Sequence, residues 1–117
     1  MIKASFTYQK ELGMVSMLIE GHSGQAEKGN DLICAASSML AYTVAQYVDY
    51  VDKACGFTEK PVIEIEDGYM RVETKPTEKY IAEVLNAFFV AEVGYSLLAQ
   101  DYPQYVELKL FGEAKEP

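Results

Sequence analysis

The order of apolar and polar residues predicts that the chain begins with a β-hairpin and continues into a long helix. Residues 1–7 alternate between apolar and polar side chains, which is typical of a strand with one buried face. Residues 14–21 are mostly apolar, which favours a central strand buried on both faces, and the polar segment 8–13 predicts the turn between the strands. From Asp31 onward, apolar residues recur at spacings of three and four, and Gly56 is expected to end this helix. The stripe expected to face the core comprises Leu32, Ala36, Met39, Leu40, Thr43, Val44, Tyr47, Val48 and Val51.

The second half of the chain repeats the hairpin and the helix and then adds one strand. Residues 62–74 contain two alternating runs around an Asp-Gly dipeptide at 67–68, a favoured two-residue hairpin turn. A second helical pattern begins near Thr77, its expected cap, and ends before Pro103, and residues 105–111 alternate again. The order β-β-α-β-β-α-β therefore predicts an α+β fold, with a mixed or antiparallel sheet packed by two long helices.

Composition and charge restrict the class of protein. The chain has 117 residues, half of them hydrophobic, so we expect a single domain spanning residues 1–117. The formal net charge is -8, and no cluster of Lys and Arg could follow a phosphate backbone, so direct nucleic-acid binding is not expected. An acidic protein attracts basic proteins or peptides. The chain shows no secretory signal and no long uncharged apolar run, so we expect a cytoplasmic protein that does not enter a membrane.

One segment, residues 21–37, concentrates the candidate chemistry. His22, the only histidine, ends the second predicted strand, and Cys34 opens the long helix after the capping pair Asn30-Asp31. A thiol in the first turn of a helix meets unpaired backbone N–H groups and the positive end of the helix dipole, which favour the thiolate. A histidine on a strand end can accept the thiol proton. The segment therefore favours a Cys-His nucleophilic site, although a lone cysteine at a helix start is more often a small buried hydrophobe.

Other residues of this segment have candidate supporting roles. The N–H groups of the first helical turn are candidate donors to an oxyanion, and Asp31 either orients the imidazole or only caps the helix. Ser23, Gly24 and Gly29 lie in a glycine-containing loop that could order around a peptide, and we name them as candidate substrate-binding residues. No cofactor is expected. No metal is expected either, because the spacing of the single histidine and the two cysteines matches no zinc finger.

The same segment resembles a known family. Gly-His at 21–22, a glycine-containing loop and Gly-x-Asp-Leu-Ile-Cys-Ala-Ala-x-Ser at 29–38 are similar to the ribosomal-processing cysteine protease family, Prp. The length and the order of elements agree as well, although Ser23 stands where the family usually has a small apolar residue.

The resemblance implies a homodimeric cysteine endopeptidase, with His22 as base and Cys34 as nucleophile. Its substrate would be the precursor of a bacterial large-subunit ribosomal protein, from which it would remove a short N-terminal extension. The alternative is a non-catalytic, ribosome-associated protein-binding module. Slow alkylation of Cys34 by iodoacetamide, as for a free thiol, would favour that alternative.

Overall fold

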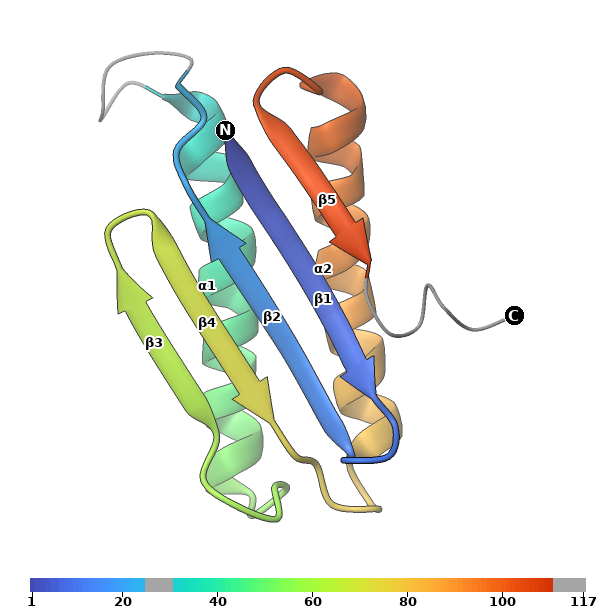
Figure 1. The fold of residues 1–117 in the computed structure, drawn as a ribbon. Helices are drawn as coiled ribbons and strands as arrows, with labels where there is room; N and C mark the ends of the chain where they lie inside the picture. Colours follow the sequence, from blue (N-terminus) through green and yellow to red (C-terminus); the bar gives the residue numbers. More distant parts are fainter. Residues whose placement is uncertain (25–30, 111–117) are drawn as a thin grey trace.

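The computed structural model describes residues 1–24 and 31–110, which form a five-stranded sheet with two helices on one face (Figure 1). The strands are β1 Ile2–Gln9, β2 Met14–Glu20, β3 Val62–Glu66, β4 Tyr69–Thr74 and β5 Val106–Leu110, and the helices are α1 Leu32–Lys53 and α2 Ile81–Asp101. The order across the sheet is β3-β4-β2-β1-β5. The β1–β5 pair is parallel and the other pairs are antiparallel, which confirms the predicted α+β fold with a mixed sheet.

The sheet has one covered face and one open face. β2 is the central strand, as predicted, and Val15, Met17 and Ile19 are buried beneath the helices. The alternate residues of β2 remain partly exposed, so the prediction of burial on both faces was wrong. On the open face, Arg71 forms ion pairs with Glu64 and Glu73 at 3.0 and 2.6 Å.

Helix α1 packs in the core through a face that agrees only in part with the predicted stripe, of which Val44, Val48 and Val51 are buried. Its buried residues are Ile33, Ser37, Ala41, Val44, Ala45, Val48 and Val51. Leu32 and Met39, which were expected in the core, are 80% and 67% exposed. The helix is apolar on two sides, so periodicity alone could not decide which side meets the sheet.

The C-terminus of α1 closes with a Schellman motif. The Gly56 N–H donates to the Val51 carbonyl at 2.9 Å, and the Cys55 N–H donates to the Asp52 carbonyl at 2.9 Å. The left-handed residue is Cys55 (φ 61°), which directly precedes Gly56, the residue expected to end the helix. Gly56 is buried, and a Cβ there would lie 2.4 Å from Val51 Cγ1. This close contact is the reason that a glycine occupies position 56.

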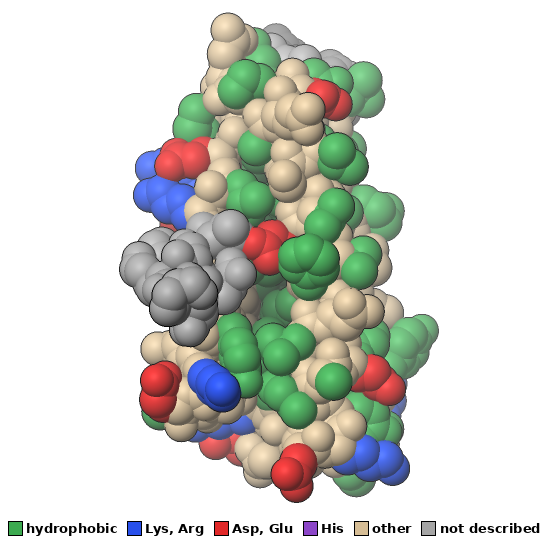
Figure 2. Space-filling model, turned by 90° about the vertical axis from the view of Figure 1, so that its right-hand side faces the viewer, with side chains coloured by type: hydrophobic (Ala, Val, Ile, Leu, Met, Phe, Trp, Pro, Cys, Tyr) green, Lys and Arg blue, Asp and Glu red, His purple; other side chains and the backbone are tan. Residues whose placement is uncertain are grey.

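Helix α2 is the more apolar of the two helices. It begins after Tyr80, so the prediction that Thr77 caps it was wrong. Thr77 instead lies in a turn before the helix, in which its carbonyl accepts a hydrogen bond from the Tyr80 N–H. Its length and a mean hydropathy of 1.5 would suit a membrane span by composition alone, with 22% of that window buried. One side of α2 packs in the core through Val84, Phe88, Ala91 and Tyr95. Figure 2, which views the β5 and α2 side, shows hydrophobic side chains at the surface along the length of the molecule.

Candidate active site

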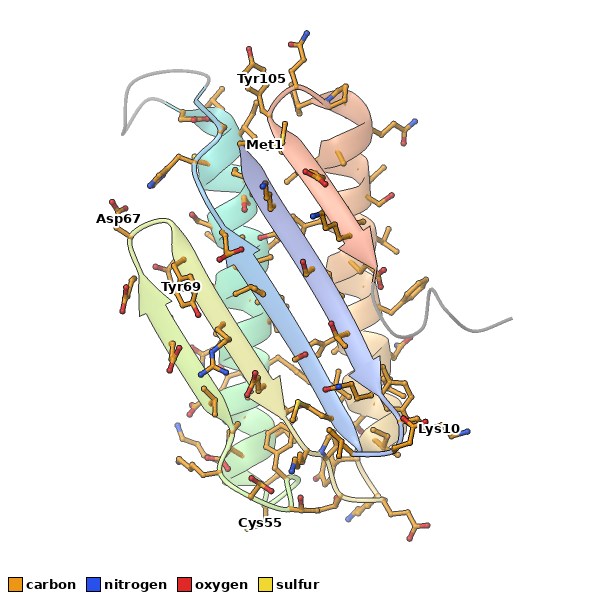
Figure 3. The ribbon with its side chains drawn as sticks, in the orientation of Figure 1. Met1, Lys10, Cys55, Asp67, Tyr69 and Tyr105 are labelled. Carbon is orange, nitrogen blue, oxygen red and sulfur yellow. The ribbon has the colours of Figure 1, made fainter. Side chains whose placement is uncertain are left out.

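Three segments that are distant in the sequence meet at one end of the molecule. They are the chain after β2, the N-terminus of α1 and the tip of the β3–β4 hairpin (Figure 1), where Asp67 lies (Figure 3). The Gly21 N–H donates to the Gly68 carbonyl at 2.8 Å and joins the first segment to the hairpin tip. Gly21 has φ +97°, and its Cα lies so close to the Met1 carbonyl that a Cβ could not fit. The hydrogen bond between Gly21 and Gly68 places the next residue, His22, beside the hairpin tip.

The three segments enclose a cleft of about 720 Å³ that contains both proposed catalytic side chains. His22 lies on its wall after β2, and Cys34 lies on its wall in α1. The remaining wall is contributed mainly by Tyr42 of α1 and by hairpin residues Ile65, Glu66, Asp67, Tyr69 and Met70. The cleft therefore combines one thiol and one imidazole with apolar and acidic side chains.

Cys34 is held at the first turn of α1 and is partly exposed to the cleft. The backbone N–H of Ser23 donates a hydrogen bond to Cys34 Sγ, with a nitrogen–sulfur distance of 3.3 Å. A donor directed at sulfur stabilises negative charge there. The fold therefore supplies a backbone donor to the sulfur that the sequence did not reveal.

Asp31 is the N-cap of α1 and also contacts Ser23 in the segment that follows β2. Its Oδ1 accepts hydrogen bonds from the N–H groups of Ile33 and Cys34 at 2.9 and 3.0 Å, and its Oδ2 accepts one from Ser23 Oγ. Asp31 is only 8% exposed, and the capping role predicted from sequence is confirmed. Two of the first-turn N–H groups that we considered as oxyanion donors, those of Ile33 and Cys34, are engaged by this cap.

His22 packs against the tip of the β3–β4 hairpin. Its Nε2 lies 3.9 Å from Asp67 Oδ2, and the two side chains are 53% and 67% exposed. A Cβ at Gly68 would lie 2.6 Å from the same nitrogen, so the imidazole ring rests on the glycine backbone. Residues 67–68 were predicted only as a turn, because their proximity to His22 depends on the pairing of β2 with β4.

The candidate substrate-binding residues have different environments. Ser23 is 3% exposed and contacts Cys34 through its backbone N–H and Asp31 through its hydroxyl. It therefore supports the cleft wall from behind. Gly24 lines the cleft with φ +75°, whereas Gly29 lies outside the described residues. Within residues 1–24 and 31–110, no three His, Cys, Asp or Glu side chains are arranged to hold a metal ion.

Comparison with known proteins identifies the family. The sequence model of cysteine protease Prp matches residues 1–107. The chain belongs to the Prp family of cysteine proteases. This protein is therefore a Prp-type cysteine protease, and the resemblance seen in residues 21–38 is confirmed. No curated protein sequence matches the chain.

Solved structures of similar proteins share the fold. The essential ribosomal processing protease Prp from S. aureus, in complex with a covalently linked product peptide, is 20% identical with a TM-score of 0.74. The alignment covers 94% of this chain and 99% of that one. SMU.848 from Streptococcus mutans is 28% identical with a TM-score of 0.67, and the alignment covers 96% and 95% of the two chains.

Proposed function

We propose that this Prp-family protease removes the short N-terminal extension of a bacterial large-subunit ribosomal protein, with Cys34 as nucleophile and His22 as base. The observation that carries the proposal is that both side chains line one cleft. His22 precedes Ser23, which lies 11 positions before Cys34 in the sequence and contacts its sulfur. The S. aureus relatives are ribosomal processing proteases in complex with a substrate peptide and with a covalently linked product peptide. Their presence in the same fold supports a peptide substrate for this cleft.

In the proposed reaction, His22 takes the thiol proton of Cys34 and the thiolate adds to the scissile carbonyl carbon. The carbon–nitrogen bond then breaks, and the imidazolium of His22 gives its proton to the leaving amine. Water, deprotonated by His22, hydrolyses the resulting thioester and releases the carboxylate product. The Ser23 N–H stabilises the sulfur whenever it carries negative charge, before the attack and after the thioester is hydrolysed.

The walls of the cleft fit a peptide that is both apolar and basic. Ile65, Tyr69 and Met70 supply apolar surface, which favours apolar or aromatic residues near the scissile bond. Glu66 and Asp67 place carboxylates at the same hairpin tip, and the chain carries a formal charge of -8. These charges favour a basic ribosomal-protein precursor over an acidic protein.

Incubation with the precursor, followed by intact-mass analysis, tests this function. Unmodified protein should yield two fragments that sum to the precursor plus one water. Cys34→Ala and His22→Ala should yield none while they keep the circular dichroism spectrum and melting temperature of the parent. Cys55→Ala is the matched control, because that thiol is exposed and lies at the opposite end of the molecule from Asp67 (Figure 3). Cleavage by folded Cys34→Ala would refute the assignment.

We also propose that the protein is cytoplasmic, as its sequence suggested, and that it forms the homodimer that its family resemblance implied. Support comes from the outer face of the two helices, where a groove of about 680 Å³ is lined largely by apolar side chains. Met39, Val90 and Leu97 on this face are 67%, 62% and 57% exposed.

Met39→Glu combined with Val90→Glu should convert dimer to monomer in sedimentation equilibrium. Leu12→Glu, in the exposed β1–β2 turn, should leave the dimer intact; a dimer that survives the double variant contradicts the proposal.

A further inference from the structure

The edge strand β3 exposes two apolar side chains on the helix-covered side of the sheet. Ile63 and Ile65 pair with Val72 and Met70 of β4, which are 0% and 5% exposed in the core. Directly paired residues of antiparallel strands point to the same face, so both isoleucines point toward the helices. They are nevertheless 37% and 45% exposed, because they lie at the end of the sheet (Figure 1).

The same two residues carry the outward backbone groups of β3. In antiparallel strands, residues alternate between hydrogen-bonded pairs and pairs whose backbone groups point away from the partner. The two-residue turn closes on Glu66 and Tyr69, which makes these two a hydrogen-bonded pair. It follows that the N–H and C=O groups of Ile63 and Ile65 point to the free edge, since β4 is the only strand that pairs with β3 in the described chain.

This edge is continuous with the proposed catalytic cleft. Ile65 lines the cleft together with His22 and Cys34, and Ile63 lies about 7 Å farther along the strand. Between them, the side chain of Glu64 points to the opposite face, where it receives two hydrogen bonds from Arg71, each 3.0 Å long. The free edge and the apolar side chains therefore lead directly from the candidate site.

We propose that an extended segment of the substrate, immediately to one side of the scissile bond, pairs with β3 as an additional strand. The proposal rests on the peptidase function proposed above. Backbone groups of the segment would pair with Ile63 and Ile65, and an apolar side chain on every second residue would pack against the two isoleucines. Such an arrangement holds the peptide extended and fixes the register that brings one carbonyl to Cys34.

A backbone scan of the substrate tests strand addition on the unmodified protein. The probes are synthetic peptides spanning the cleavage junction, each N-methylated at one of the four positions on either side of the scissile bond. We expect N-methylation to lower kcat/KM at least tenfold at two positions of the peptide that lie on the same side of the scissile bond and have one residue between them. Methylation of the position between them should change kcat/KM less than threefold. Equal tolerance at all positions, or losses without alternation, overturns the proposal.

Variants of the edge supply a second test. Ile63→Pro removes an outward N–H without removing a hydrogen bond to β4, and Ile63→Ala removes only the side chain. We expect Ile63→Pro to raise KM at least fivefold more than Ile63→Ala, with kcat nearly unchanged. Equal KM values overturn the proposal, as does an effect on sedimentation without an effect on KM. If Ile63→Pro does not fold, the peptide scan decides.

These experiments separate the two proposals. Failure of the unmodified enzyme to cleave the unmethylated peptide or the precursor contradicts the peptidase function. Normal cleavage of the unmethylated peptide, with full tolerance of N-methylation, contradicts only strand addition at β3.

Discussion

Gly68 makes a close backbone contact with the imidazole of His22, and this contact gives a sharp test of how the base is positioned. Because a Cβ at position 68 would lie 2.6 Å from Nε2, Gly68→Ala should displace the ring and lower kcat at least tenfold. Gly13→Ala is the matched control, since Gly13 has a similar φ of +64° and a Cβ there would meet no described atom within 4 Å. Both variants should lose about 1 kcal/mol of stability. Equal activity of the two variants would show that Gly68 does not position His22.

Asp31 offers a test of two roles that the sequence left open. Its described contacts are those of a helix cap and of an acceptor for the Ser23 hydroxyl, so Asp31→Ala should lower the free energy of unfolding by about 1–2 kcal/mol. Asp31→Asn keeps an acceptor for the Ile33 and Cys34 N–H groups and should retain activity within about threefold. A loss of kcat by orders of magnitude in stable Asp31→Asn would instead assign the carboxylate to the orientation of the imidazole.

Tyr95 predicts how stability depends on pH in the alkaline range. Its hydroxyl donates to the Ser37 carbonyl at 2.7 Å, and burial raises the pKa of Tyr95 to about 12. The unfolded chain releases this proton near pH 10. The stabilising contribution is therefore complete below about pH 10 and is lost as the pH rises toward 12. Tyr95→Phe should be less stable at neutral pH by about 1 kcal/mol.

Urea denaturation of both proteins between pH 8 and pH 12 checks this prediction. Between the two pKa values, the free energy of unfolding of the parent should fall with pH more steeply than that of Tyr95→Phe, by up to about 1.4 kcal/mol per pH unit. Burial also raises the pKa of Tyr47, so part of the slope should remain in the variant. Parallel curves for the two proteins would contradict the assignment.

At the scale of an element, the C-terminus of α1 shows that the left-handed residue of a Schellman motif can lie one position before the glycine. A glycine is the usual left-handed residue of a Schellman motif, but here Cys55 has φ 61° and Gly56 is required for packing against Val51. Cys55→Gly should therefore increase the free energy of unfolding by about 1 kcal/mol. Cys55→Ala, which keeps a Cβ in the left-handed conformation, should not. Unchanged stability in Cys55→Gly, measured by urea denaturation, would contradict this account.

The sequence predicted elements well wherever local chemistry decides their position. Asp31 caps α1 through side-chain contacts with residues two and three positions ahead, and 67–68 form the turn of the second hairpin. The faces of the helices were harder to predict, because Leu32 and Met39 have the spacing of core residues but lie outside the interface with the sheet. A helix with two apolar sides needs the positions of its neighbours before its buried side can be known.

At the scale of the whole molecule, the strand order decides what the candidate site contains. The sequence identified His22, Cys34 and Asp31, because they lie within one short segment of the chain. The hairpin tip with Asp67 and Gly68 could not be assigned to the site, since its place depends on the antiparallel pairing of β2 with β4 across about fifty residues. The edge position of β3 has the same origin.

Capture of the covalent intermediate tests the central claim, that Cys34 attacks the substrate, most directly. Mixing the protein with excess precursor peptide and quenching with acid within one turnover should leave a thioester on the protein. Peptide mapping by mass spectrometry should place the N-terminal fragment of the substrate on Cys34, and the adduct should be absent from Cys34→Ala. The account is contradicted if the fragment maps to Cys55, or if the peptide is cleaved without any adduct on Cys34.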